Sequence, residues 1–476
     1  MRPEIEEFIN RMMNAYQLPG LAVGIMAGDE TICCNGFGVH SIGHKAKVSG
    51  NTVFQMGSLS KVFVATAILQ LSEQGKIDLD EKLVTYIPYF RMNDDRYAAI
   101  TIRQILSHQS GIPDVEDFEW SRPQNDEGAA RRYVESFAGL SLIGKPGESY
   151  QYSNRAYDAL ADLIHIVSGK LFETYIKDHL FLPMNMHDST FIYPEIKRKL
   201  LAWPHQLDKN FRNGMREIYP YNRIHAPSST LYSSTADMLN WIKTNLNNGT
   251  FNSTPIVSAE SHALLMNPVV TTEPDTHMCL AWKKCIRHGY TIFVSLGGEP
   301  GFRSFLVLLP DKKLGVIASC NSDTISAEHI GLPIMYHLMG EELPVPKTPI
   351  YLPMGRVLME KGISQAIDEY HHLKNNFPDQ YDFHDSHLNE LAFKLLHKRH
   401  KTKEAVSIFE LIISCNEGYW GTYSGLAHAY ERLGKIESAI KYYKIALDMN
   451  PGNQHLVQRL QKIEYTKNSQ SSLQTQ

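Results

Sequence analysis

The stretch Phe54–Leu71, FQMGSLSKVFVATAILQL, holds the features around which the rest of the chain is arranged. Gly57 permits a tight turn, and the apolar run after Lys61 has the length of a buried helix that Gly75 is placed to end. Ser58 and Lys61 are three positions apart and would share a helix face. A serine in a first helical turn lies near N–H groups that favour negative charge, and a lysine against an apolar wall loses its proton more easily. The stretch therefore predicts a serine nucleophile activated by a lysine base.

The spacing of Ser58 and Lys61 is a loose pattern when it is taken alone. A chain of this length is expected to contain about two such pairs by chance. A second pair does occur, at Ser438 and Lys441, within a segment that has the apolar spacing of a structural helix. The catalytic interpretation of the first pair therefore depends on motifs elsewhere in the chain.

Composition and charge are those of ordinary globular domains. A length of 476 residues suggests two or three domains, and 43% hydrophobic with 21% charged residues is typical of folded proteins. The net charge of −4 gives no electrostatic reason to expect nucleic acid or an anionic membrane as a partner. No apolar run reaches the length of a membrane span, and the acidic residues 1–10 do not resemble a signal peptide.

Cysteine and histidine usage favours a cytoplasmic protein without a metal site. The six cysteines lie in apolar contexts, which favours free buried thiols in a reducing compartment over disulfides. The 21 histidines form no metal-binding motif, so we expect no metal and no other cofactor. A Gly-rich phosphate loop is missing, and so is the Gly-x-Ser-x-Gly elbow that would indicate an α/β-hydrolase.

Residues 1–340 predict one domain of class α+β. Helices are expected over 3–16 and 154–168, the second with Gly169 as its C-cap. The predicted strands are 21–27, 31–39, 290–295, 304–309 and 314–320. Because strands occur at both ends of the domain with helices between them, we expect one antiparallel sheet whose edges come from the two ends.

The remaining chain predicts a linker followed by helical repeats. Residues 341–350, rich in proline and charge, form the linker. Residues 351–466 read as tetratricopeptide-like helical repeats, of which 423–451 has the strongest 34-residue spacing. Such repeats predict a protein or peptide partner bound along their concave face, although about three units could instead only brace or dimerise the first domain. The polar tail 467–476 is expected to be disordered.

A second motif, Tyr152-x-Asn154, follows the serine and lysine at a distance that points to a family. It is accompanied by other short stretches in a fixed order, namely Leu18–Val23, Leu106–Pro113, Pro146–Glu148 and Pro300–Phe302. Over about residues 5–335 the chain resembles the penicillin-recognising serine hydrolases, in particular the class C β-lactamase and esterase branch. The resemblance implies a β-lactamase/transpeptidase-like fold, in which helices flank the antiparallel sheet and add an all-helical lobe.

The resemblance also implies a role for each matching residue. Ser58 would attack a carbonyl to form an acyl-enzyme, and Lys61 would take its proton. Tyr152 would donate a proton to the leaving group, with its pKa adjusted by the neighbouring lysine. Asn154 would bind the lysine and a substrate amide. From the residues alone, Tyr152 could equally be a buried structural tyrosine, and Asn154 could be the N-cap of its helix.

A third element of the family is altered in this chain. Where the family has Lys or His, any residue and then Gly, the chain has Ser295-Leu296-Gly297. Gly297 keeps the close backbone approach of a strand beside the serine, and the amide of Gly298 would form an oxyanion hole with that of Ser58. The missing cation argues against substrates whose carboxylate is held there, unless Arg303 or His288 replaces it.

Two functions follow from these motifs. The first is a serine hydrolase that acts through an acyl-enzyme on an ester or a small amide or peptide, with esterase ranked before peptidase and β-lactamase. The second is a weak or inactive β-lactamase-like scaffold that works mainly through protein–protein interaction. The retained Ser58, Lys61, Tyr152 and Asn154 favour the first function, and Ser295 favours the second.

Overall fold

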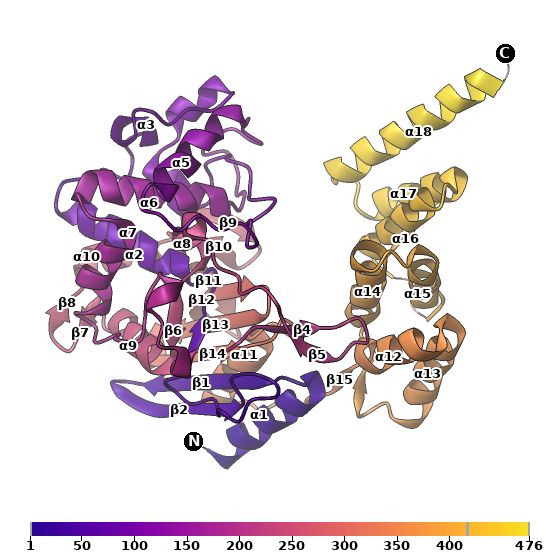
Figure 1. Cartoon of the computed structure of the whole chain (residues 1–476), viewed down its shortest axis with the longest axis horizontal. Helices are drawn as coiled ribbons and strands as arrows, with labels where there is room; N and C mark the ends of the chain where they lie inside the picture. Colours follow the sequence, from indigo (N-terminus) through magenta and orange to yellow (C-terminus); the bar gives the residue numbers. More distant parts are fainter. Residues whose placement is uncertain (1, 416–417, 475–476) are drawn as a thin grey trace. The chain divides into compact units, whose positions relative to one another are not determined.

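Short apolar segments from the two ends of the first 345 residues pair into one sheet in the computed structural model, which describes residues 2–415 and 418–474 (Figure 1). The sheet is antiparallel throughout, in the order β2-β1-β14-β13-β12-β11-β10-β9. Its strands are β1 (Gly20–Ala27), β2 (Glu30–Gly38), β9 (Val270–Glu273), β10 (Thr276–Met278), β11 (Lys283–Arg287), β12 (Tyr290–Glu299), β13 (Phe302–Leu309) and β14 (Leu314–Cys320).

The sheet differs from the expected one at its edges. Strand β1 pairs with β14, so the last strand of the domain lies inside the sheet and β9 forms the far edge. Strands β9, β10 and β11 were not predicted, because they are only three to five residues long and carry polar side chains without a regular apolar alternation. The α+β class with a large antiparallel sheet is confirmed.

Helices cover both faces of the sheet. Helices α1 (Pro3–Tyr16) and α11 (Glu328–Leu338) pack on one face, in a core that includes Phe8, Phe305 and Ile334. On the other face, α9 (Thr235–Leu246) lies against β1 and β14. The central helix α2 (Ser60–Glu73) is apolar all round and buried along nearly its whole length, as expected for a helix enclosed by others.

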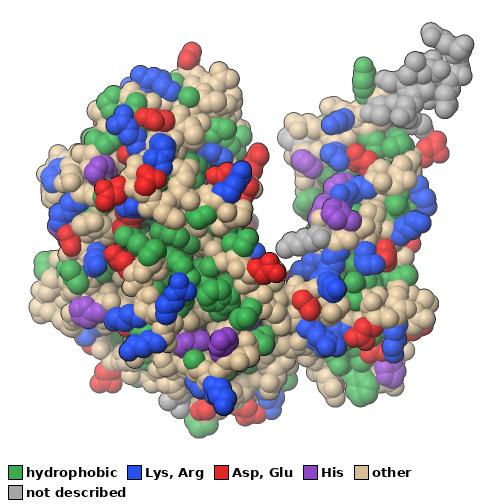
Figure 2. Space-filling view, in the orientation of Figure 1, with side chains coloured by type: hydrophobic (Ala, Val, Ile, Leu, Met, Phe, Trp, Pro, Cys, Tyr) green, Lys and Arg blue, Asp and Glu red, His purple; other side chains and the backbone are tan. Residues whose placement is uncertain are grey.

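The helical lobe consists of segments between β3 and β9. It contains α6 (Asn154–Ser168), which begins and ends where the sequence predicted, with Gly169 at φ 73° after its last turn. The other short elements of this unit are α3 (Leu83–Tyr86), α4 (Ile102–Leu106), α5 (Ala129–Glu135), α7 (Phe172–Ile176), α8 (Ala226–Ser229), α10 (Ala259–Met266), and the strands β3 (Val53–Gln55), β4 (His205–Leu207), β5 (Asn213–Met215), β6 (Tyr232–Ser234), β7 (Thr250–Phe251) and β8 (Thr254–Pro255). In Figure 2, hydrophobic side chains gather near the middle of the visible face of this unit.

A second compact unit is formed by Leu207–Arg212 and the chain from Pro346 onward. Its helices are α12 (Tyr351–Lys361), α13 (Ile363–Asn376), α14 (Asp385–Phe393), α15 (Thr402–Cys415), α16 (Trp420–Arg432), α17 (Ile436–Met449) and α18 (Gln454–Gln474). Residues 348–349 of the expected linker form strand β15, which pairs in parallel with β16 (Tyr381–Asp382). Pairs of small and large residues at the repeat spacing are buried between the helices: Ala366 with Tyr370, Ala405 with Phe409, and Ala439 with Tyr443.

Two further expectations concern the C-terminal tail and the free, buried state of the cysteines. Helix α18 ends at Gln474, and residues 475–476 lie outside the described part of the chain, so the disorder expected for residues 467–476 stays a prediction. All six cysteines are free, and Cys34 and Cys415 are half-buried rather than buried. Within residues 2–415 and 418–474, no helix is both long enough and apolar enough to cross a membrane.

Candidate active site

Ser58 lies in a tight turn that connects strand β3 to helix α2. Gly57 adopts φ 55°, and α2 begins at Ser60, so the serine precedes the helix instead of lying within its first turn. The turn is packed directly on β12, because a Cβ atom on Gly57 would lie 2.6 Å from the backbone nitrogen of Gly298. The side chain of Lys61 still reaches the serine, and its Nζ donates to Ser58 Oγ at 2.9 Å.

Lys61 has three hydrogen-bond partners although only 2% of its surface is exposed. Besides Ser58 Oγ, its Nζ donates to Asn154 Oδ1 at 2.7 Å and to the carbonyl oxygen of Ser228 at 2.6 Å. The last two atoms can only accept, so a neutral lysine amine would give them its two hydrogens and point its lone pair at Ser58. Burial lowers the pKa of Lys61 to about 7, against the opposing influence of nearby carboxylates.

Tyr152 brings a phenol to the same oxygen from the loop before α6. Its Oη lies 2.7 Å from Ser58 Oγ and donates to Asn154 Oδ1 at 3.3 Å. The ring lies 4.3 Å, centroid to centroid, from the ring of His108. Part of the ring is exposed, but desolvation around the hydroxyl raises the pKa of Tyr152 above its usual value of 10. Burial outweighs the lowering that comes from the hydrogen bond with Ser58, so the phenol stays protonated at neutral pH and the expected adjustment by the lysine is not found.

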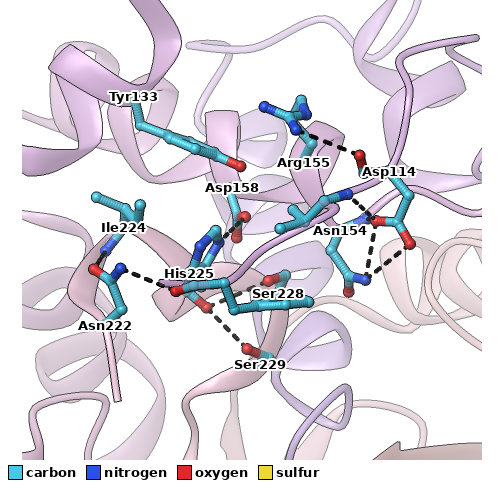
Figure 3. Close-up of polar contacts among 12 residues, drawn as sticks. Asp114, Tyr133, Asn154, Arg155, Asp158, Asn222, Ile224, His225, Ser228 and Ser229 are labelled. Atoms are coloured by element: carbon cyan, nitrogen blue, oxygen red, sulfur yellow. Dashed lines mark hydrogen bonds and ion pairs between the residues drawn. The ribbon is translucent and has the colours of Figure 1, made fainter. Parts of the chain in front are cut away.

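Asn154 is the first residue of α6 and is oriented by a carboxylate. The N-cap is Ser153, whose Oγ accepts from the N–H of Ala156 at 3.0 Å, so Asn154 does not cap the helix. Asp114 accepts from the backbone N–H of Asn154 at 2.7 Å and from its Nδ2 at 3.0 Å (Figure 3). These bonds fix which end of the amide carries the oxygen, and they turn Oδ1 toward Lys61. The predicted contact of Asn154 with Lys61 is present, and its predicted contact with a substrate amide stays a prediction.

Strand β12 supplies the remaining predicted residues. A Cβ atom on Gly297 would lie 1.8 Å from the carbonyl oxygen of Met56, so only glycine allows the strand to approach the serine turn this closely. The next residue, Gly298, lies at the same contact between β12 and the serine turn, with its backbone nitrogen close to Gly57. Ser295 is 6% exposed and lies at the wall of a cavity of about 320 Å³. The lining residues of this cavity are Ser58, Lys61, His108, Tyr150, Tyr152, Met278, Ala281, Lys283, Val294, Ser295 and Leu296.

Neither residue considered as a replacement for the missing cation lines this cavity. Arg303 donates to the carbonyl oxygens of Glu299 at 2.8 Å and Phe302 at 2.7 Å. His288 forms an ion pair with Glu341 at 3.0 Å. Among the residues that the structure describes, no group of three or more His, Cys, Asp or Glu side chains is arranged to hold a metal ion.

Comparison of the sequence with models of protein families gives a match over the part of the chain that forms this site. A model of the Beta-lactamase family matches residues 5–333, more than half of the sequence. The chain belongs to the Beta-lactamase family. A Tetratricopeptide repeat model matches residues 421–453 of the same chain.

This Beta-lactamase family chain has low sequence identity to the individual relatives. It is 27% identical over 339 residues to Protein flp of Staphylococcus aureus strain MW2, covering 70% of the chain and 66% of that protein's length. Penicillin-binding protein 4 of Amycolatopsis lactamdurans is 25% identical over 361 residues, which is 73% of the chain and 92% of the relative. The chain thus spans slightly less than two thirds of the flp proteins.

Solved structures show the same fold. The octameric penicillin-binding protein homologue from Pyrococcus abyssi superposes with a TM-score of 0.63 and 24% identity, covering 75% of the chain and 81% of that structure. A class C beta-lactamase gives a TM-score of 0.62 at 16% identity, covering 71% of the chain and 96% of the structure. The Beta-lactamase family fold of residues 5–333 is therefore shown both by sequence and by structure.

Sequence reasoning missed several groups around Lys61 in this Beta-lactamase family domain, among them the half-buried Asp114 and the buried Glu299. Asp114 orients Asn154, and Glu299 is 6% exposed with its pKa raised by burial to about 8, partly offset by a hydrogen bond from Ser229. Asp114 follows the Gly111–Pro113 turn and Glu299 lies inside a Gly-Gly-Glu-Pro-Gly segment. Proximity to a glycine-rich motif was the only signal available for either residue.

A buried pair supports the carbonyl group that Lys61 contacts. His225 Nδ1 and Asp158 Oδ2 are 2.7 Å apart, and both side chains are almost fully buried (Figure 3). The carbonyl oxygen of His225 accepts from Ser228 Oγ at 3.3 Å and Ser229 Oγ at 3.4 Å. These contacts hold the turn of α8 from which the carbonyl of Ser228 points at Lys61. No local motif marks them, because α6 and α8 come from distant parts of the chain.

Proposed function

We propose that the protein is a serine hydrolase in which Ser58 forms an acyl-enzyme with an ester or a small amide. The observation that supports the proposal most directly is the set of hydrogen bonds around Lys61. Asn154 Oδ1 and the carbonyl oxygen of Ser228 accept from its Nζ, so the lone pair of a neutral amine would point at Ser58 Oγ, 2.9 Å away. A lysine pKa near 7 makes that neutral form available at physiological pH.

The proposed acylation moves one proton from Ser58 to Lys61 and one from Tyr152 to the leaving group, after which Lys61 reprotonates Tyr152. Lys61 takes the proton of Ser58 while Oγ bonds to the substrate carbonyl carbon, and the N–H groups of Ser58 and Gly298 bind the oxyanion. The bond to the leaving group then breaks, and the leaving group takes the proton of Tyr152. The ammonium group of Lys61 then returns a proton to the phenolate of Tyr152. Its Nζ lies 5.0 Å from the centroid of the Tyr152 ring. Water releases the acyl group by the reverse sequence.

Esters are the preferred substrate class within this proposal, followed by small peptides and then β-lactams. Alkoxides and phenoxides leave more easily than amines, and Ser295 offers no charge for the carboxylate that β-lactams carry. A cytoplasmic location remains part of the proposal, supported by the small number of cysteines and their apolar contexts.

Labelling with a fluorophosphonate tests the proposal, together with a screen of p-nitrophenyl esters and D-aminoacyl amides. We expect label on Ser58 of the folded protein, no label on Ser58→Ala, and none after heat denaturation. Equal labelling of folded and denatured protein would favour the second candidate function, an inactive scaffold, for which the serine at position 295 is the supporting observation.

The repeat unit supports a second part of the proposal, a peptide partner for the helical hairpins. Buried small and large residues at the repeat spacing stack α15, α16 and α17, as in other peptide-binding repeats. A peptide library screened against the full chain tests this. Selected peptides that bind equally well to fluorophosphonate-treated protein would support the repeats as the binding site, and peptides displaced by the label would contradict it.

A further inference from the structure

The free edge of strand β12 leads away from the serine along the cavity wall. Strand β11 pairs with β12 only as far as the rung that joins Lys283 and Val294. Before this rung the chain leaves the sheet at Ala281, which has φ 68° and donates its N–H to the carbonyl of Leu106 at 3.0 Å. Within the described part of the chain, no strand therefore pairs with residues 295–299 on this side, and the cavity opens along that edge.

Lys283 stands at the end of this open edge. It lines the same cavity as Ser58 and Ser295 and is half-buried. Among the residues that the structure describes, its side chain has no hydrogen-bond or ion-pair partner. An ammonium group that is partly removed from water without a counter-ion is an incomplete interaction, and a substrate anion would complete it.

The charge of the whole cavity favours an anion. Its wall contains two lysines, Lys61 and Lys283, and no aspartate, glutamate or arginine. The imidazole of His108 stays neutral because burial lowers its pKa well below the usual value, with Lys61 contributing in the same direction, and burial raises the pKa of the phenols of Tyr150 and Tyr152. When Lys61 is the free amine that the proposed mechanism needs, Lys283 remains as a cationic side chain of the cavity wall, which contains no side-chain carboxylate.

We infer that Lys283 binds a carboxylate on the leaving group of the substrate, and so replaces from strand β11 the cation that is missing at Ser295 of β12. The inference rests on the proposed function. Tyr152, the proposed proton donor to the leaving group, lines the same cavity as Ser58 and Lys283, so a leaving group bound beside Tyr152 shares this cavity with the ammonium group. The carboxylate would then be held from β11 and not from position 295 of β12, where the β-lactam carboxylate is expected, so the ranking of β-lactams is unchanged.

Two matched esters of N-acetylglycine test the inference, one with 3-hydroxybenzoate and one with 3-hydroxybenzamide as the leaving group. After division by each ester's uncatalysed hydroxide rate, we expect kcat/KM to favour the carboxylate by about tenfold or more, the range of a charge-assisted hydrogen bond. Lys283→Met should abolish this preference by raising KM for the benzoate ester and leaving the benzamide ester unchanged. Lys283→Arg should keep the preference, and Lys283→Glu should reverse it.

Lys284→Met is the matched control, because this neighbouring lysine of β11 does not line the cavity. The inference is overturned if wild type hydrolyses both esters equally, or if Lys283→Met slows both to the same extent. Either result leaves the proposed function intact as long as Ser58→Ala removes the hydrolysis. If wild type hydrolyses neither ester and Ser58 takes no fluorophosphonate, the proposed function fails and the inference fails with it.

Discussion

Two buried groups with opposite charges control protonation at the candidate nucleophile. Lys61 has a pKa of about 7 and Glu299 a pKa of about 8, so at pH 7 Glu299 is mainly protonated and neutral, while Lys61 is divided between its ammonium and free amine forms. Because the two sites influence one another, their titration steps belong to the pair. The free amine that the proposed mechanism needs forms as the pH rises through this range.

The pH dependence of hydrolysis follows from this pair. We expect kcat/KM for a neutral ester to rise with pH along a limb with an apparent pKa near 7. Glu299→Gln removes a carboxylate that favours the ammonium form of Lys61, so the limb should move to lower pH. The measurement is kcat/KM from pH 5 to 9 for both proteins, and a shift of the limb to higher pH would contradict the assignment.

Stability should depend on pH through the same lysine. The pKa of Lys61 is near 7 when folded and 10.5 when unfolded, so between these values the unfolded chain binds more protons and the free energy of unfolding rises with pH. Lys61→Met removes this contribution. Urea unfolding at pH 7 and pH 9 should therefore show wild type gaining stability relative to Lys61→Met. A difference that stays constant or shrinks would mean that the lysine is not desolvated.

Asp114 is expected to act by orienting Asn154. Asp114→Ala frees the amide to rotate, so that Oδ1 no longer holds a hydrogen of Lys61. We expect kcat to fall about tenfold to a hundredfold, the cost of losing precise positioning, with little change in Tm. Asp117→Ala, at a position nearby in the same loop, is the control. Equal loss in both variants would indicate a general effect on the loop.

At the scale of elements, the contact between β12 and the serine turn depends on glycine. In Gly297→Ala, the added Cβ would overlap the backbone oxygen of Met56, so the strand must move away from Ser58. We expect fluorophosphonate labelling to fall by at least about a hundredfold. Gly139→Ala, where nothing lies within 4 Å of the new Cβ, is the control and should label normally. Normal labelling of Gly297→Ala would show that β12 does not set the site.

The elements that sequence predicted best are those with strong periodicity and clear caps. Helices α1 and α6 and strand β14 have the expected ends, because apolar spacing and capping residues are local signals. Strands β9 to β11 are short and polar, and they carry no such signal. Their pairing depends on tertiary contacts, which propensity does not report.

The candidate site divides in the same way. Ser58, Lys61, Tyr152 and Asn154 could be predicted because two short motifs contain all four, and the structure brings them within hydrogen-bond distance of one another. Asp114 lies 40 residues from its partner, and Ser228 contributes only a backbone carbonyl, which any residue type has. Contacts of these two kinds leave no pattern in a single sequence.

At the scale of the whole molecule, the two units have separate hydrophobic cores. The core of the repeat unit includes Ala439 and Tyr443, both buried between its helices. Tyr443→Ala should lower the Tm of this unit, because it leaves a cavity in a small core. We expect Ser58-dependent esterase activity at 25 °C to remain within about twofold of wild type. Loss of activity in step with the repeat fold would show that the units depend on each other.

The most direct test of the central claim is the rate at which a fluorophosphonate modifies Ser58 as a function of pH, with the modified residue identified by mass spectrometry. We expect an adduct on Ser58 whose rate of formation rises through about pH 7 in wild type, and falls by at least about a hundredfold in Lys61→Met. An adduct on another residue, or a rate on Ser58 that is unchanged in Lys61→Met, would contradict it.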